Sequence, residues 1–157
     1  MDKFEKIFGE KKTDQTYTDR PSVYAIIFNE TKDQIMIVQS LKTGNYFLPG
    51  GGMEDKETKE QCLHREALEE LGCKIEIGKY IGSAGNYFYS PTYDTYYFMI
   101  GYFYFARIIE KVQESTEPGE TYGWMQTSEA MKDLIHAHHK WALEKAWEDQ
   151  NGNDCFT

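Results

Sequence analysis

Runs of apolar residues separated by polar turns predict short strands in the first part of the chain. Residues 22–28 form a β-branched and aromatic run that predicts a buried strand. A second apolar run, residues 34–39, follows a polar turn and is expected to complete a hairpin with the first. Residues 45–48 then lead into the loop of residues 49–52, Pro-Gly-Gly-Gly, which interrupts regular structure.

The apolar spacing changes to a helical period after this glycine loop. Leu63, Ala67 and Leu71 recur four residues apart, and Gly72 stands where a helix C-cap is preferred, so residues 57–71 predict an amphipathic helix. The remaining pattern predicts a strand over 73–81, one or two strands within 93–109, a polar loop over 114–119, a short strand around Trp124, and helices over 128–134 and 135–148.

These elements are expected to share one hydrophobic core. The chain has 157 residues, the size of one ordinary domain, and it contains no internal repeat and no linker-like or low-complexity segment. We therefore predict a single domain over residues 1–157 that mixes strands and helices.

Composition narrows the class of protein. Apolar residues make up 40% and charged residues 27%, as in globular proteins. No run approaches the roughly 20 apolar residues of a membrane helix, and the first residues lack the apolar core of a signal peptide. Cys62, Cys73 and Cys155 are odd in number and form no C-x-x-C pair. We expect a cytoplasmic protein with reduced thiols and no membrane partner.

The formal net charge of −9 bears on the ligand. Binding to a long nucleic acid requires clustered Lys and Arg, which release counterions, so that partner is not expected. An acidic protein can still bind a small phosphate ester when a metal cation lies between the two negative partners.

The most informative segment is residues 51–73, GGMEDKETKEQCLHREALEELGC, where the glycine loop continues into a helix rich in carboxylates. It resembles the Nudix box, G-x5-E-x7-R-E-U-x-E-E-x-G-U, in which U is a bulky apolar residue. Every fixed position is matched, by Gly51, Glu57, Arg65, Glu66, Glu69, Glu70 and Gly72. Ala67 and Cys73 fill two U positions with smaller side chains, which predicts slightly looser helix packing.

Three of the matched carboxylates share one helix face. Glu66, Glu69 and Glu70 stand at i, i+3 and i+4. Like charges at this spacing destabilise an isolated helix by about 0.2–0.5 kcal/mol per pair, and a bound divalent cation would convert the repulsion into attraction. Hard cations prefer oxygen ligands, so the pattern favours Mg²⁺ or Mn²⁺.

The resemblance implies a fold and an activity. The fold is an α/β/α sandwich with a mixed β-sheet between helices. The activity is divalent-metal-dependent hydrolysis of a phosphoanhydride bond in a nucleoside diphosphate linked to another moiety, which is a small nucleotide-like substrate. The alternatives are a house-cleaning hydrolase of oxidised nucleoside triphosphates and a non-catalytic nucleotide-sensing module.

The resemblance also implies roles for the matched residues. Glu66, Glu69 and Glu70 would bind the metal with the Gly50 carbonyl, and Glu66 or Glu70 would also orient or deprotonate the attacking water. Glu57 and Arg65 would pair and hold the loop against the helix. Gly51 and Gly52 have no Cβ, so their backbone can approach the substrate closely.

Family members often recruit one more acid from a loop, and Glu117 or Glu120 is expected to supply it, with Glu117 favoured. The alternative is a solvated turn. Tyr89 lies where diadenosine polyphosphate hydrolases carry a tyrosine, and it is a candidate for substrate binding in a tyrosine-rich stretch that could also form strand core or a homodimer interface. His136, His138 and His139 would suit a transition metal, but a surface or packing role is favoured.

Overall fold

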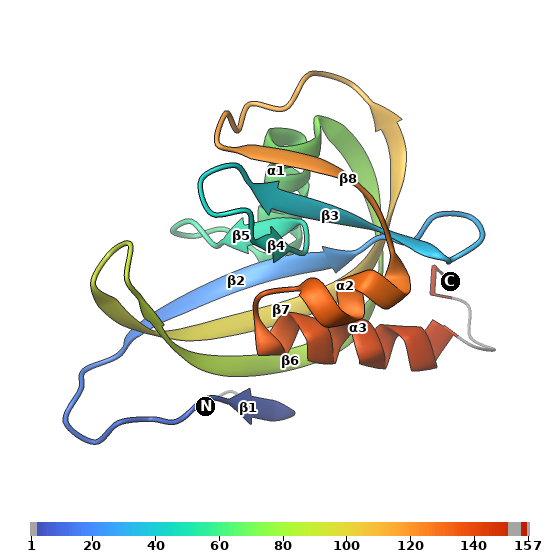
Figure 1. Ribbon diagram of the computed structural model, residues 1–157. Helices are drawn as coiled ribbons and strands as arrows, with labels where there is room; N and C mark the ends of the chain where they lie inside the picture. The colour runs from blue at the N-terminus through green and yellow to red at the C-terminus, as the bar shows by residue number, and fades with distance from the viewer. Residues whose placement is uncertain (1–2, 151–154, 157) are drawn as a thin grey trace.

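The computed structural model describes residues 3–150 and 155–156 (Figure 1). Its strands are β1 (Lys6–Phe8), β2 (Thr18–Ile26), β3 (Gln34–Ser40), β4 (Tyr46–Phe47), β5 (Gly50–Gly52), β6 (Cys73–Ser90), β7 (Thr95–Lys111) and β8 (Glu120–Gln126). Its helices are α1 (Lys59–Leu71), α2 (Thr127–Asp133) and α3 (Ala137–Gln150). Among these described residues, no helix is both long and apolar enough to span a membrane.

The strands form two sheets. A five-stranded mixed sheet has the order β1-β6-β7-β2-β5, with β2 parallel to β7 and antiparallel to β5. A three-stranded antiparallel sheet has the order β4-β3-β8. The glycine loop therefore lies where the chain passes from one sheet to the other, because β4 and β5 belong to different sheets.

The predicted hairpin between residues 22–28 and 34–39 is wrong. Both segments are strands, but their backbones pair only at the bridge between Phe28 and Ile35, and the strands then belong to separate sheets. Both edges of β2 are already paired, with β7 on one side and β5 on the other, so β3 has no free edge to join. Although β3 follows β2 directly in the chain, β2 pairs with β5 and β7, which come later.

The strand predicted over residues 73–81 is longer than expected. β6 runs to Ser90 and pairs with β7 in one long hairpin with register shifts. The stretch predicted over residues 93–109 holds one strand, which begins at Thr95, while residues 93 and 94 lie in the turn before it. Small residues such as Gly85 interrupt the apolar pattern of β6. The ring of Phe98 covers Gly85, where a Cβ would lie only 2.4 Å from that ring, so the strand continues through the glycine.

Helix α1 begins at a capping box. The Thr58 hydroxyl accepts from the Gln61 amide, and the Gln61 side chain accepts from the Thr58 amide. The helix ends at Gly72, which adopts the left-handed conformation predicted for a C-cap, with φ of 67°. Glu57, which was predicted to lie in the helix, is therefore in the loop before it.

Two apolar clusters lie on opposite faces of the sheets. Leu63, Ala67 and Leu71 of α1 pack in one cluster, and Ala142 and Leu143 of α3 pack in the other. In Figure 1, α1 lies on the far side of the strands while α2 and α3 lie on the near side. This arrangement confirms the predicted α/β/α sandwich with a mixed sheet.

Candidate active site

Arg65 joins the glycine loop to the helix. Its Nε donates to Glu57 Oε2 at 2.6 Å and its Nη2 donates to Glu57 Oε1 at 2.9 Å, a bidentate pair. Nη2 also donates to the Gly52 carbonyl at 3.0 Å. The Arg65 guanidinium lowers the pKa of Glu57 to about 2, so this carboxylate stays ionised. The expected contact between Glu57 and Arg65 is present.

The remaining edge of the guanidinium binds two of the box carboxylates. Arg65 Nη1 lies 3.0 Å from Glu66 Oε1 and 3.1 Å from Glu69 Oε2. Burial raises the pKa of Glu66 against the effect of this arginine. The acidic helix face predicted from the sequence therefore already has one cation between two of its carboxylates.

Glu70 points inward and is buried, with 6% of its surface exposed. Its Oε1 accepts from the Gly50 amide at 2.7 Å. Burial raises the pKa of Glu70 well above its usual value, and the negative charges of Glu120 and Glu66 raise it further. A buried carboxyl near two other acids is unfavourable for the bare protein, which makes this position a candidate for function.

The backbone of β5 lies directly against these carboxylates. Gly50 has φ of 140°, and a Cβ there would lie 2.1 Å from the Val23 carbonyl oxygen. A Cβ on Gly51 would lie 2.6 Å from Glu66 Oε1. Only glycine allows β5 to lie this close to both β2 and α1.

The loop before β8 is docked on the C-terminal end of α1. The Ser115 hydroxyl and the Thr116 amide both donate to the Glu69 carbonyl, at 3.0 and 2.8 Å. This docking brings the Glu117 charge near Glu66 and the Glu120 charge near Glu70. Burial and Glu117 raise the pKa of Glu120. The sequence favoured Glu117, whereas proximity to Glu70 favours Glu120.

The box carboxylates are not arranged as a metal-binding site. Among residues 3–150 and 155–156, no group of three or more His, Cys, Asp and Glu side chains is arranged to hold a metal ion. Glu66 and Glu69 turn to Arg65, and Glu70 turns to Gly50. The predicted cation site on these three carboxylates and the Gly50 carbonyl stays a prediction.

A cavity of about 550 Å³ opens beside Glu70 and Glu120. Gly50 and Gly51 of the glycine loop form part of its wall. Aromatic side chains make up much of the remaining wall: Tyr24, Phe47, Phe88, Tyr93 and Tyr97. Among the described residues that line the cavity, the Lys and Arg side chains are those of Arg20 and Lys42.

Two residues assigned to substrate binding do not line this cavity. Gly52 binds Arg65 through its carbonyl instead. The neighbours of Tyr89, Phe88 and Ser90, line the cavity, and successive strand residues face opposite sides, so Tyr89 faces away. Its hydroxyl donates to Asp94 at 2.6 Å. A role for Tyr89 in substrate binding stays a prediction. Strand alternation places its neighbour Phe88 in the cavity wall.

The cavity also contains residues that sequence reasoning did not assign to the site. Arg20 precedes the buried part of β2, and its guanidinium lies 5.8 Å from the centre of the Tyr97 ring. No motif surrounds Arg20 in the sequence. Its place in the lining results from the parallel pairing of β2 with β7, where Arg20 lies opposite Met99.

The three histidines near the start of α3 are buried in the core, which agrees with the favoured packing role. His138 and His139 are 1% and 0% exposed, and His136 lines the cavity. Several of their ring nitrogens have no hydrogen-bond partner within the described part of the chain.

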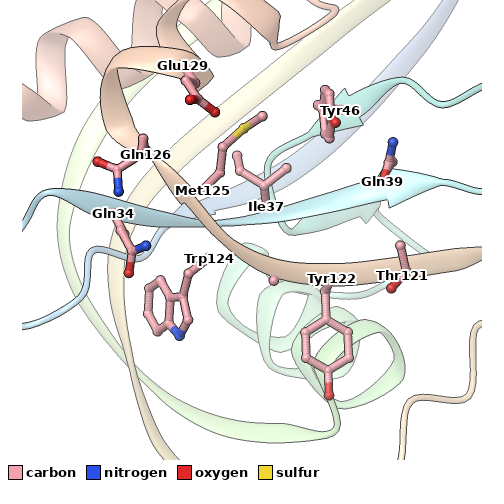
Figure 2. A pocket seen from close by; sticks show the side chains of 11 residues that line it. Gln34, Ile37, Gln39, Tyr46, Thr121, Tyr122, Trp124, Met125, Gln126 and Glu129 are labelled. Carbon is pink, nitrogen blue, oxygen red and sulfur yellow. The ribbon is translucent and has the colours of Figure 1, made fainter.

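A second hollow of about 400 Å³ lies over β3 and β8, away from the box residues. Figure 2 shows Tyr122 and Trp124 projecting from one side of β8 and Met125 from the other. Its acidic lining among the described residues is limited to Glu129. Of these two hollows, the one beside Glu70 combines the glycine loop with clustered carboxylates.

Comparisons with known proteins support this assignment. The NUDIX domain family profile matches residues 18–145. Diphosphoinositol polyphosphate phosphohydrolase 2 of Homo sapiens is 28% identical over 131 residues, covering 80% of this chain and 70% of the relative. Diphosphoinositol polyphosphate phosphohydrolase 3-alpha of Homo sapiens is 27% identical over 131 residues, covering 80% and 77%.

Solved structures show the same fold. A NUDIX hydrolase from Nitrosomonas europaea superposes with a TM-score of 0.69 at 17% identity, covering 83% of this chain and 90% of that one. A MutT NUDIX hydrolase from Burkholderia pseudomallei gives a TM-score of 0.61 at 22% identity, covering 82% and 98%. With the box complete and the family profile spanning most of its length, the chain belongs to the NUDIX family and is a hydrolase that acts on phosphorus-containing anhydrides.

Proposed function

We propose that the protein hydrolyses the pyrophosphate bond of a nucleoside diphosphate linked to another moiety, with Mg²⁺ or Mn²⁺ held by the carboxylates of α1. The observation that carries this proposal is Glu70, a buried carboxyl beside Glu120 and Glu66 whose pKa is raised by burial and by both neighbours. Such a cluster is unstable alone and is stabilised by a hard cation.

The donor set fits a hard divalent cation. Glu66, Glu69, Glu70 and Glu120 supply carboxylate oxygens, and the backbone of β5 lies against two of these side chains. The Gly50 carbonyl is the further ligand that the family pattern implies. When bound, the cation neutralises the charge of the polyphosphate and lowers the pKa of a water molecule.

Residues of this chain position the carboxylates and accept the proton of the attacking water. Gly50 donates its N–H to Glu70 and fixes that carboxyl, while Arg65 orients Glu66 and Glu69. Glu66 or Glu70 accepts the proton of the attacking water, because each combines a site near the glycine loop with a raised pKa.

The cavity beside Glu70 supports a substrate with an aromatic ring. A base can stack on side chains such as Tyr24, Phe88 and Tyr97. The curated relatives are named for diphosphoinositol polyphosphates, which carry many phosphates and call for several cations. Arg20 and Lys42 alone supply Lys or Arg charge among the described lining residues, which favours a short phosphate chain.

A substrate panel with product identification tests this proposal. We expect turnover of ADP-ribose or another nucleoside diphosphate conjugate with Mg²⁺ or Mn²⁺, giving two phosphomonoesters. Preference for an oxidised nucleoside triphosphate, with release of pyrophosphate, would select the house-cleaning alternative. Preference for a diphosphoinositol polyphosphate would select the activity named for the relatives. Nucleotide binding without turnover of any compound would select the sensing module.

Glu70→Gln is the matching variant, and Glu144→Gln is its control because Glu144 is exposed on α3, across the sheets. Glu70→Gln keeps the size and hydrogen-bond acceptor of the side chain, and we expect kcat to fall by about 100-fold or more. Near-normal turnover in Glu70→Gln would refute the assigned role of this carboxyl.

A further inference from the structure

The segment Leu48-Pro49 crosses from one sheet to the other. It follows β4 of the three-stranded sheet and precedes β5 of the five-stranded sheet. The Pro49 carbonyl accepts from the Ala25 amide at 2.8 Å. The amide of Leu48, which is 1% exposed, lies in the interior at the point where the strand pairing changes. A buried amide without an acceptor destabilises a fold, so this amide requires one.

A histidine of α3 supplies that acceptor. Leu48 N donates to His139 Nδ1 at 3.3 Å, between residues 91 apart in the chain. The imidazole is fully buried and packs 4.2 Å from the Tyr24 ring, centre to centre. Because Nδ1 accepts, the proton of the neutral ring lies on Nε2, which has no partner among the residues described. An apolar side chain would fill this place without an unpaired nitrogen, so packing alone does not account for histidine here.

The hydrogen bond from Leu48 to His139 lies two residues before the hydrogen bond from Gly50 to Glu70. From Leu48 the chain continues through Pro49, whose ring restricts the backbone, to Gly50. Gly50 N then donates to Glu70 Oε1 at 2.7 Å. With one restricted residue between the two donors, a shift of the Leu48 amide moves the Gly50 amide and its carboxylate partner.

We propose that His139 is a positioning residue for hydrolysis: its Nδ1 fixes the segment from Leu48 to Gly50 and thereby holds the Glu70 carboxyl. The proposal rests on the role of Glu70 in the proposed function. His139 does not line the cavity, so it acts through the loop and makes no contact with substrate.

His138 provides a matched control. It neighbours His139, is equally buried at 1% exposure, and its ring centre lies 4.7 Å from that of His139. Neither of its ring nitrogens has a hydrogen-bond partner in the described residues. Replacing His138 therefore removes a core imidazole from the same helix while leaving the bond to Leu48 in place.

The kinetic test compares His139→Leu, His139→Asn and His138→Leu in the full chain. Leu removes the acceptor, whereas the Asn Oδ1 can replace Nδ1. We expect His139→Leu to lower kcat by about 10- to 100-fold with little change in KM, because a displacement near 1 Å has that effect on a catalytic group. His139→Asn should recover most of the loss, and His138→Leu should keep the wild-type rate. Equal rates for the two Leu variants would overturn the proposal.

Nuclear magnetic resonance can detect the hydrogen bond from Leu48 to His139 directly in the wild-type protein, without turnover and without a substitution. In the ¹⁵N-labelled wild-type protein we expect a scalar coupling between the Leu48 amide nitrogen and His139 Nδ1. Its absence would overturn the proposal. The Gly50 amide resonance should shift in His139→Leu and return in His139→Asn, and a shift of equal size in His138→Leu would also contradict it. Should the wild-type protein cleave no phosphoanhydride, the proposed function fails while these resonances still decide the positioning claim.

Discussion

Arg65 contacts groups that lie apart in the sequence. Its guanidinium donates to Glu57 before the helix, to the Gly52 carbonyl in β5, and to Glu66 and Glu69 on its own helix. The planar, forked donor set of arginine suits this task, because each edge of the group meets a different acceptor. Lysine offers one point charge and cannot make the same contacts.

Arg65→Lys should therefore lower both activity and stability. We expect kcat to fall by about 10-fold or more, since the loop and two box carboxylates lose their common partner, and the free energy of unfolding to fall by about 1–3 kcal/mol. Steady-state kinetics and urea denaturation measure the two effects.

Arg107→Lys is the control for Arg65→Lys. Arg107 pairs with Glu76, and these side chains are 58% and 40% exposed, so the substitution should change stability by less than about 1 kcal/mol. If the two lysine variants behaved alike, the organising role of Arg65 would be incorrect.

At the scale of elements, the end of α1 and the loop that follows β7 depend on one glycine. Gly72 has φ of 67°, and a Cβ there would lie 2.0 Å from the Gln113 carbonyl oxygen. The Gly72 carbonyl accepts from the amides of Val112 and Gln113, at 2.9 and 3.2 Å. The same loop leads to Glu117 and Glu120, so the helix cap and the acidic cluster are physically linked.

Gly72→Ala should destabilise the protein by more than about 1–2 kcal/mol, because the left-handed conformation alone has that effect and the Gln113 carbonyl must also move. Thermal or urea unfolding measures the loss. Gly119→Ala is the matched control, since nothing lies within 4 Å of a Cβ built there. A Gly72→Ala protein as stable as Gly119→Ala would show that the cap is unimportant.

Local patterns in the sequence predicted the elements that carry the chemistry. The spacing of Leu63, Ala67 and Leu71 with Gly72 predicted α1, and the box pattern predicted the pairing of Arg65 with Glu57 across two helical turns. The first prediction depends on the helical repeat, and the second on the family pattern for two residues that are close together in the chain.

Contacts between residues far apart in the chain could not be predicted from the sequence. The bond from Leu48 to His139 joins residues 91 apart, and no periodicity indicates which buried amide lacks a strand partner. Strand alternation could have separated Phe88 from Tyr89, but the sequence does not tell which side of β6 faces the cavity. The predicted hairpin of β2 with β3 was wrong because competition for the edges of β2 is decided by the whole sheet.

Across the whole molecule, the two helical layers contribute different titratable groups to the interior. Helix α1 brings carboxylates to the glycine loop, while His138 and His139 of α3 pack against Phe103 in the opposite core cluster. The single domain over residues 1–157, the cytoplasmic location and the homodimer predicted from the sequence stay predictions.

The buried histidines give stability a defined dependence on pH. Burial lowers the pKa of His136 to about 4, with a contribution from Arg20, and burial lowers that of His138 to about 3. In the unfolded chain, histidine titrates near its ordinary value of about 6.5. As the pH falls below that value, the unfolded state takes up protons that the folded state refuses, so stability decreases until the folded pKa is reached. Glu66, Glu70 and Glu120, whose pKa values are raised, act in the opposite direction.

The effect of His138 can be isolated by following the unfolding free energy of wild type and His138→Leu from pH 7 to pH 4. Below pH 6.5 the wild-type protein should lose up to about 1.4 kcal/mol per pH unit more than the variant, the linkage of one proton. Curves that stay parallel over this range would show that His138 is protonated in the folded protein.

The most direct test of the central claim is Mn²⁺ binding followed by electron paramagnetic resonance on wild type, Glu70→Gln and Glu144→Gln. If Glu70, Glu66 and Glu120 hold a divalent cation at the glycine loop, wild type and Glu144→Gln should bind Mn²⁺ equally, and Glu70→Gln should bind it at least about 10-fold more weakly. Equal Mn²⁺ affinity in all three proteins, or no Mn²⁺ binding by the wild-type protein even with a nucleotide present, would contradict the account.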